Sequence, residues 1–282
     1  RAGLQPQLAL IHSAGEGAGA LGLGWSLGMP ALERSLRLGI PRYDGSDAWV
    51  LRGLGGGEEL TEVAPGVYRE RIEQGPPVIV RALPGGAMSA VTTDGTGYLF
   101  GLTGDARLSG DGGDYRLELS AITDVHGNRL DFEYIRAPGS TAPLLAAIIY
   151  NDGRAAVRLA YEARPDIVRT RAPGFVVELR HRLHTLTTEA LGAPVRTTTL
   201  TYARSTLVPA SVLARIDTVA ADGTALPPWE LDYTGGFETP RVLEIAHAPA
   251  IDPTADGHAW LDLDGDALPD LLDATGDVWR YR

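Results

Sequence analysis

Apolar and polar residues alternate along much of this chain, and such alternation predicts β-strands with one buried face. The clearest run extends from Tyr115 to Ile122, and a second one follows from Arg129 to Tyr134. The five residues between them, Asp-Val-His-Gly-Asn at 124–128, include types that tolerate positive φ angles. We therefore expect the two runs to form an antiparallel hairpin.

Three further segments, 148–161, 181–202 and 216–233, have the same organisation around turns of Asn, Asp, Gly or Pro. The second run of each hairpin ends in an apolar residue, a spacer and a tyrosine. Including the first hairpin, the tyrosines are Tyr134, Tyr161, Tyr202 and Tyr233. Their unequal spacing argues against a strict solenoid. We therefore predict an all-β fold in which repeated antiparallel hairpins form a large curved sheet, with the tyrosines as core residues rather than ligand-binding ones.

The composition is that of a globular protein. Apolar residues make up 44% of the 282 positions, and 36 acidic residues against 25 basic ones give a net charge of −11. This balance argues against a nucleic acid or an anionic membrane as partner. No apolar run approaches the roughly 18 residues of a membrane span. Cysteine is absent, so we expect neither a disulfide framework nor a cysteine zinc site.

The most distinctive stretch runs from Gly19 to Gly28, where four glycines surround Trp25. Glycine lets the backbone turn freely and approach other elements closely, while the indole supplies a large area to bury. The stretch therefore predicts a structural junction with Trp25 buried in it.

Two enzyme motifs also fit this stretch by their letters. Residues 17–22 match the G-x-G-x-x-G dinucleotide fingerprint, and residues 24–28 match the G-x-S-x-G nucleophile elbow around Ser26. Both motifs need a helix directly after them. Gly28 and Pro30 make that helix unfavourable. A nucleotide site and a serine hydrolase using Ser26 are therefore alternatives that the sequence does not favour.

Near the carboxyl end, acidic residues recur at positions 1, 3, 5 and 9 of a short loop. The predicted calcium ligands are the side chains of Asp262, Asp264, Asp266 and Asp270, with the backbone carbonyl of Leu268. A hard cation such as Ca²⁺ prefers several oxygen ligands that converge within one turn. The loop lacks the glutamate that ends an EF-hand loop, and a solvated acidic turn is the simpler alternative.

Three segments together resemble the SpvB-type amino-terminal region of bacterial toxin-complex B (TcB) components and related virulence-plasmid proteins. They are Leu4–Leu10, Gly22–Leu27 and Gly39–Asp44, and the resemblance makes Gly22, Gly24, Trp25, Ser26, Pro41 and Tyr43 structural residues. His12 departs from the pattern, since the family usually has tyrosine there. The tyrosine-ended hairpins are similar to the YD or RHS repeats of toxin-complex shells. The acidic loop resembles the FG-GAP or VCBS calcium loop that starts a β-propeller blade.

The resemblance implies three segments: an SpvB-like shell domain over 1–240, a linker over 241–258 and the start of a propeller blade over 259–282. We expect the chain to be part of a longer, secreted virulence protein. The implied function is a non-enzymatic shell module that helps encapsulate and deliver a toxin, with toxin-complex C-type and A-type components and the rest of its own chain as partners. An extracellular adhesion or glycan-binding module is the alternative from another class.

Overall fold

The computed structural model describes residues 3–205, 209–233, 255–261, 263 and 270–281. The chain divides into two compact units, Arg1–Thr239 and Pro240–Arg282, and each is described by itself. The structure is nearly all β, as the alternation predicts. Among the described residues, no helix has the length and apolarity that crossing a membrane requires.

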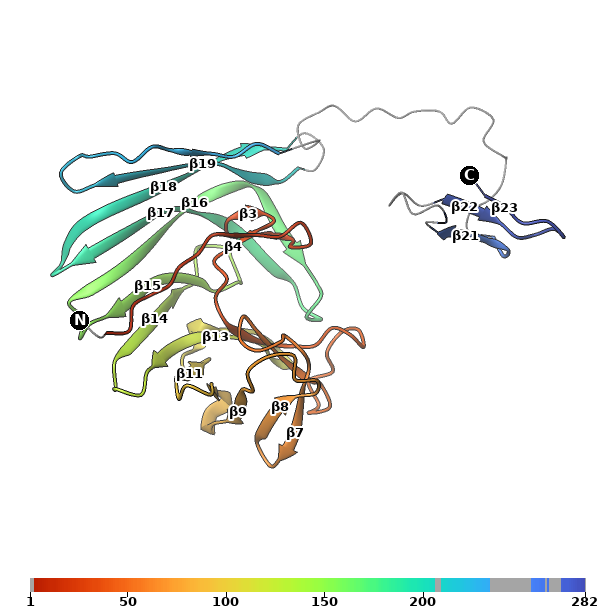
Figure 1. The fold of residues 1–282 in the computed structure, drawn as a ribbon, viewed down its shortest axis with the longest axis horizontal. Helices are drawn as coiled ribbons and strands as arrows, with labels where there is room; N and C mark the ends of the chain where they lie inside the picture. The colour runs from red at the N-terminus through yellow and green to blue at the C-terminus, as the bar shows by residue number, and fades with distance from the viewer. Residues whose placement is uncertain (1–2, 206–208, 234–254, 262, 264–269, 282) are drawn as a thin grey trace. The chain divides into compact units, whose positions relative to one another are not determined.

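The first unit is built on one sixteen-stranded antiparallel sheet, which Figure 1 shows as a curved fan of strands. Its main path runs in the order β20-β19-β18-β17-β16-β15-β14-β13-β11-β10-β9-β8-β7. The strands of the first half are β5 (Ala31–Arg34), β6 (Trp49–Arg52), β7 (Leu60–Ala64), β8 (Val67–Glu70), β9 (Ile79–Ala82), β10 (Met88–Val91), β11 (Gly97–Phe100) and β12 (Arg107–Gly110). Those of the second half are β13 (Gly113–Thr123), β14 (Arg129–Ile135), β15 (Leu144–Tyr150), β16 (Ala155–Thr170), β17 (Val177–Ala190), β18 (Ala193–Arg204), β19 (Ser211–Ala220) and β20 (Trp229–Glu230).

Strand β13 joins two parts of this sheet. Its carboxyl-terminal half pairs with β11 and β14, whereas its amino-terminal half pairs with β12 and β5. Strand β5 then pairs with β6. The side chains that alternate along β13 explain why it can do this, because Leu117, Leu119 and Ala121 are fully buried on one face. Strand β13 thus contributes buried side chains to both parts of the sheet.

The predicted hairpins are present, with one correction. Strands β13 and β14 form the expected hairpin around residues 124–128. The second strand of the next hairpin, β16, does not end at Tyr161 but continues to Thr170, because its second half pairs with the start of β17. The segment Gly110–Asp114 forms the tight turn and strand ends that join β12 to β13.

The four repeated tyrosines share one hydrogen bond: each hydroxyl donates to the backbone carbonyl of a leucine in the preceding strand. The pairs, with O···O distances, are Tyr134 to Leu119 (2.9 Å), Tyr161 to Leu145 (2.7 Å), Tyr202 to Leu183 (2.6 Å) and Tyr233 to Leu213 (2.5 Å). Burial raises the pKa of the phenol well above its usual value in Tyr134, Tyr161 and Tyr202. These hydroxyls therefore stay protonated and remain donors.

Each acceptor leucine lies where the strand register shifts. The residues paired directly after the four shifts are Phe100 with Leu119, Tyr134 with Leu145, Tyr161 with Leu183, and Tyr202 with Leu213. A β-bulge disrupts backbone pairing locally and bends the strand. The tyrosine hydroxyl supplies a hydrogen-bond donor to the carbonyl at that point. Tyr134, Tyr161 and Tyr202 thus pack against the core, as predicted, and all four tyrosines donate a hydrogen bond at a bulge.

The main core lies on the inner face of this sheet. Its fully buried side chains include Phe100, Ile148, Leu183, Leu200 and Leu213. Tyr134, Tyr161 and Tyr202 are half-buried and pack against the same cluster. One continuous core therefore extends from β7 to β19.

The second unit has a three-stranded antiparallel sheet of β21 (His258–Leu261), β22 (Asp270–Asp273) and β23 (Arg280–Tyr281). Leu261 pairs with Asp270, so residues 262–269 connect two paired strands. Of the predicted calcium ligands, Asp262, Asp264, Asp266 and Leu268 lie outside the described residues. Most of the predicted linker, 241–258, lies outside them as well.

We predict that Tyr161→Phe and Tyr202→Phe each lower the free energy of unfolding by about 1 kcal/mol, because the bulge carbonyl loses its donor while the ring stays packed. Urea denaturation followed by circular dichroism measures this. Tyr68→Phe is the matched control, since among the described residues the Tyr68 hydroxyl has no hydrogen-bond partner. Equal effects in all three variants would contradict the role of the bulge hydrogen bonds.

Candidate functional site

The amino-terminal segment crosses the curved sheet, as the red trace in Figure 1 shows. We call residues 3–29 the strap. Leu4, Leu8 and Leu10 pack against the main core, and exposed residues alternate with them. The strap then folds into short paired strands: β1 (Ile11–His12) pairs with β4 (Trp25–Ser26), and β2 (Ala18–Gly19) with β3 (Gly22–Leu23). An extended segment with one apolar face therefore covers part of the sheet.

At Gly22 the strap backbone lies close to strand β19 of the sheet. The φ of Gly22 is +88°, and a Cβ atom there would lie 2.7 Å from the backbone oxygen of Ser211 in β19. Gly24 has a φ of +77°, and a Cβ there would lie 2.8 Å from Nε2 of His12. A side chain at either position would be strained and would lack space. The structure therefore explains why glycine is needed at two of the positions around Trp25.

Trp25 joins the strap to the far end of the sheet. Its indole Nε1 donates to the hydroxyl of Tyr233 at 2.7 Å, and that hydroxyl donates to the Leu213 carbonyl. The His12 ring lies 5.0 Å from the Trp25 ring between centroids. Trp25 is half-buried, not buried as predicted. It packs against the main core and also lines a cavity, so it is not enclosed on all sides.

Neither enzyme motif has its required context. Residues 17–22 form the β2–β3 turn, and Ser26 lies in β4 opposite Ile11. The chain continues from Ser26 into strand β5 rather than into a helix. Within the part of the chain that the structure describes, the Ser26 hydroxyl has no histidine or carboxylate as hydrogen-bond partner. The geometry of a nucleophile elbow is therefore not formed here.

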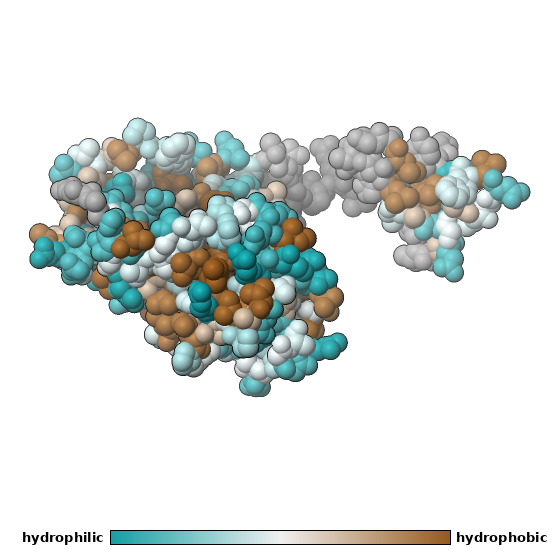
Figure 2. All heavy atoms as spheres, turned by 60° about the horizontal axis from the view of Figure 1, so that its bottom comes forward, coloured by the Kyte–Doolittle hydropathy of each residue, from teal (hydrophilic) through white to brown (hydrophobic). Residues whose placement is uncertain are grey.

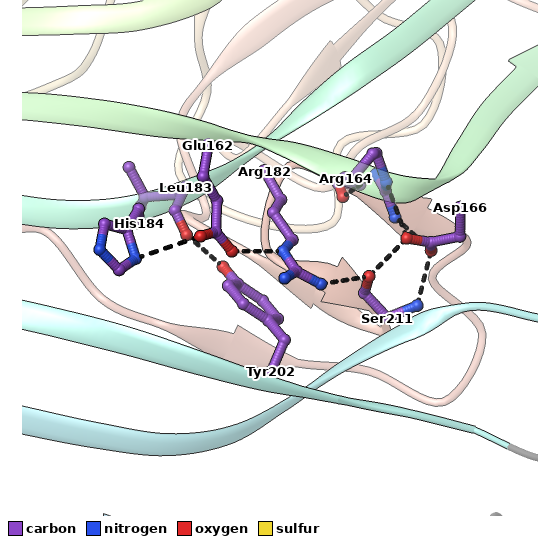
Figure 3. A network of polar contacts seen from close by, with 9 residues as sticks. Glu162, Arg164, Asp166, Arg182, Leu183, His184, Tyr202 and Ser211 are labelled. Atoms are coloured by element: carbon purple, nitrogen blue, oxygen red, sulfur yellow. Dashed lines mark hydrogen bonds and ion pairs between the residues drawn. The ribbon is translucent and has the colours of Figure 1, made fainter.

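A buried ion pair between Arg164 and Asp166, drawn in Figure 3, also contacts the strap. The side chains of Arg164 and Asp166 in β16 are 0% and 4% exposed, and Arg164 Nη2 lies 2.9 Å from Asp166 Oδ2. Arg164 Nη1 donates to the Gly19 carbonyl of the strap at 2.9 Å. Asp166 accepts from the backbone N–H of Ser211 at 2.6 Å and from its hydroxyl. The pair thus connects the strap, β16 and β19.

The same network continues along β17. Arg182 Nη1 donates to the Ser211 hydroxyl at 2.8 Å, and Arg182 Nε donates to Glu162 at 2.6 Å. The Arg182 guanidinium lies over the Tyr202 ring, 4.5 Å from its centroid. The backbone N–H of the adjacent Leu183 donates to the Ala20 carbonyl of the strap at 2.7 Å. The residues at both ends of the network therefore donate hydrogen bonds to strap carbonyls, Arg164 to Gly19 and Leu183 to Ala20. Figure 3 shows the side chains that connect them.

The electrostatics of this network favour an ionised Asp166. Burial alone would raise the pKa of its carboxyl, but hydrogen bonds from Arg164 and Ser211 outweigh burial and lower the pKa to about 2. An ionised carboxylate that accepts several hydrogen bonds is stabilised in the folded state. The network is therefore fully formed at neutral pH.

Pro41 and Tyr43, the other predicted structural residues, form a second contact. Pro41 is buried, and Tyr43 has a φ of +59°. The Tyr43 hydroxyl donates to the Pro173 carbonyl at 2.6 Å, and its backbone N–H donates to Asp47 at 2.7 Å. The Arg34 guanidinium lies 5.2 Å from the Tyr43 ring centroid. This motif thus connects the loop after β5 to the loop between β16 and β17.

A cavity of about 750 Å³ lies between the strap and the sheet, with Trp25 and Ser26 in its lining. Besides Glu16, four charged residues line it, Arg52, Glu33, Arg116 and Glu118, and these four form a chain of ion pairs that begins with Arg52 and Glu33 at 2.8 Å. Arg116 then lies 3.0 Å from Glu33 and 2.9 Å from Glu118. Glu118 raises the pKa of Arg116, so the guanidinium stays charged. These opposite charges are paired with one another. We therefore interpret the four residues as structural parts of the cavity wall.

Comparisons with known proteins support this arrangement. Residues 1–76 match the family described as SpvB, Salmonella virulence plasmid 65kDa B protein. The structure is similar to that of the amino-terminal domain of the effector protein SpvB from Salmonella typhimurium strain LT2, with a TM-score of 0.67 and 18% identity over 78% of this chain and 95% of that one. The strap and the Pro41 motif both lie within the matched residues.

The same fold occurs in toxin complexes. The structure of TcdB2-TccC3 matches with a TM-score of 0.67 and 19% identity over 100% of this chain. The Tc holotoxin pore of Photorhabdus luminescens matches with a TM-score of 0.69 and 19% identity over 98% of it. This chain spans only 18% and 17% of those two chains. A comparison with curated proteins found no match. The chain thus has the SpvB-type fold, shared with TcdB2-type toxin components.

Sequence reasoning missed the Arg164–Asp166 network. Arg164 and Asp166 are two residues apart and lie in a strand where charged and apolar residues mix, so the sequence gives no sign that their side chains are buried. Their partners Gly19 and Ser211 are 145 and 45 residues away. The one available signal was the failure of the apolar alternation after Tyr161.

We predict that Asp166→Asn lowers the free energy of unfolding at pH 7 by about 2 kcal/mol, because the native pKa lies near 2 and the usual value is 3.8. The native pKa is the lower one, so this stabilisation is present above pH 4 and is lost as the pH falls toward 2. Denaturation of both proteins between pH 7 and pH 2 measures it, with Asp131→Asn as an exposed control. A difference between Asp166→Asn and the unmodified protein that persists unchanged at pH 2 would contradict this electrostatic account.

Proposed function

We propose that this chain is a non-enzymatic structural module of a toxin-complex B-like protein, in which its sheet forms part of a shell that encapsulates a toxin and helps deliver it. The observation that supports this most is the curved sixteen-stranded sheet crossed by its strap, a fold shared with TcdB2-TccC3. We further propose secretion from a bacterium and a C-type protein as partner, by analogy with that TccC3 complex. An A-type component would then deliver the assembly.

The edges of the sheet support a role within a larger shell. Strand β20 has only two residues, and β7 at the other edge pairs with β8 alone on the main path. Edge strands present unpaired backbone groups that another strand can join. Figure 2 also shows apolar side chains grouped at the surface of the first unit between polar ones. Exposed apolar groups of this kind mark interaction surfaces, which a shell module needs toward the rest of its own chain.

An extracellular adhesion module is the alternative, and one experiment separates the two functions. The natural full-length protein that contains these residues is co-expressed with its C-type partner, and the complex is imaged by electron cryomicroscopy and treated with protease. We expect a hollow particle in which the carboxyl-terminal part of the partner resists a protease that degrades the same partner expressed alone. A solid particle, or a partner that is cleaved equally in both samples, would contradict the shell.

We also propose that the acidic loop binds one Ca²⁺ through Asp262, Asp264, Asp266, Asp270 and the carbonyl of Leu268, and that it begins a propeller blade. The described residues place this loop between the paired strands β21 and β22. Asp270 Oδ2 accepts the backbone N–H of Leu263 at 2.9 Å, so this carboxylate lies at the base of the loop. Oxygen ligands at this spacing are those that Ca²⁺ prefers.

Calcium is expected to stabilise the second unit by mass action, by about 2.7 kcal/mol when free calcium is a hundred times its dissociation constant. Melting curves of the full-length protein in millimolar calcium and in chelator measure this. The variant Asp262→Asn/Asp266→Asn is expected to lose the difference, whereas Asp256→Asn, outside the loop, keeps it. Identical curves for the unmodified protein with calcium and with chelator would leave a solvated acidic turn as the better interpretation.

A further inference from the structure

A second cavity, of about 550 Å³, lies at the turns of two neighbouring hairpins and the beginning of the strap. It is separate from the cavity beside Trp25 and shares no lining residue with it. The polar side chains in its lining are Gln5, His126, Asn128, Arg129, Asn151 and Asp152, together with Tyr150. Volumes of this size are typical of small-molecule sites.

The framework of this cavity is rigid. Asp124 Oδ1 accepts the backbone N–H groups of His126 and Asn128, both at 2.9 Å. Asp124 Oδ2 accepts the side-chain amide of Asn128 at 2.7 Å. On the neighbouring hairpin, Tyr150 lies in β15 opposite Leu130 and packs against the main core. The strands thus fix both turns before any ligand arrives.

The turn at the end of β15 uses residues that cost backbone strain. Asn151 and Asp152 have φ angles of +54° and +53°, where glycine is the favoured residue. Both side chains are exposed. Asparagine and aspartate tolerate this conformation better than other residues do, and here they present an amide and a carboxylate at the cavity.

Five of the seven polar residues in the lining have side chains without a partner in the described part of the chain; Asn128 and Arg129 are paired. Within the described part of the chain, the side chains of Gln5, His126, Asn151 and Asp152 and the hydroxyl of Tyr150 make no hydrogen bond or ion pair. Several other turn aspartates are engaged by their own turns. Asp94, for example, accepts the Thr96 N–H at 3.0 Å, and Asp222 accepts the Thr224 N–H at 2.9 Å. Asp152 and its neighbours therefore keep their hydrogen-bonding capacity for something outside the chain.

The chemistry of the lining defines the class of ligand. The amides of Gln5 and Asn151 and the imidazole of His126 can each donate and accept, and the Asp152 carboxylate accepts only. The one cation in the lining, Arg129, is already paired with Asp131 at 2.7 Å. An unpaired carboxylate and a paired arginine disfavour an anionic ligand. Tyr150 is the aromatic residue in the lining.

We infer that this cavity binds a neutral saccharide. A sugar carries hydroxyls that donate and accept at its rim and apolar C–H groups on its ring faces, which matches amides, a carboxylate and an aromatic ring on a rigid frame. The carboxylate accepts sugar hydroxyls in charge-assisted hydrogen bonds, which are stronger than neutral ones. This site is independent of the shell function and can exist with or without it.

The test uses the 282-residue chain on an array of neutral, sialylated and sulfated glycans, followed by titration of the best neutral glycan with NMR detection. Binding of neutral glycans is expected, with shifts of the amide signals of residues 126–129 and 150–154. Asp152→Gly removes the carboxylate while glycine retains the positive φ, and it is expected to weaken binding about tenfold or more. Tyr150→Phe and His126→Ala are expected to weaken binding as well.

Leu191→Gly is the matched control, because Leu191 is an exposed turn residue with a φ of +53° that does not line the cavity. It is expected to bind as the unmodified protein does. The inference is overturned if no neutral glycan binds at millimolar concentration, if only anionic glycans bind, or if Asp152→Gly binds as tightly as Leu191→Gly.

Discussion

The curved sheet depends on the close contact between the strap and strands β16, β17 and β19, which lie far from the strap in the sequence. At Gly22 the strap backbone lies so near the Ser211 carbonyl that a Cβ atom would approach to 2.7 Å. Around this contact, Arg164 donates to the Gly19 carbonyl and Leu183 donates to the Ala20 carbonyl. Three strands of the sheet are thus held to a segment that is otherwise attached by short pairings and apolar contacts. Without it, a wide single sheet would lose the cover on part of its core.

Curvature has a separate cause, which repeats along the sheet. Each bulge bends its strand, and each tyrosine hydroxyl donates to the carbonyl at that bulge. The last of these tyrosines, Tyr233, also accepts from Trp25. The last tyrosine of the repeat therefore connects the curved sheet to the strap. The similarity to TcdB2-TccC3 over the whole chain shows that this curved fold is shared with that structure.

The sequence predicts much of the fold but little of this anchoring. The β13–β14 hairpin follows from local alternation and a local turn, so it is predicted within a residue or two. The glycines around Trp25 predict a junction, yet its partners Tyr233 and Ser211 are about 200 residues away, and no local pattern indicates them. Bulges depend on how two strands align, so the hydrogen bonds of the tyrosines are invisible in the sequence, although the tyrosines themselves are not. Burial of Arg164 and Asp166 runs against their residue types, and only the tertiary structure explains it.

The anchoring account is tested most directly by hydrogen exchange of the backbone amides in Gly22→Ala and Gly39→Ala. Both glycines have positive φ angles, +88° and +100°, so both substitutions strain the backbone. Only Gly22 has a neighbour, because nothing lies within 4 Å of a Cβ atom at Gly39. The account predicts faster exchange in β16, β17 and β19 for Gly22→Ala and unchanged exchange there for Gly39→Ala. Equal exchange of these strands in the two variants would contradict it.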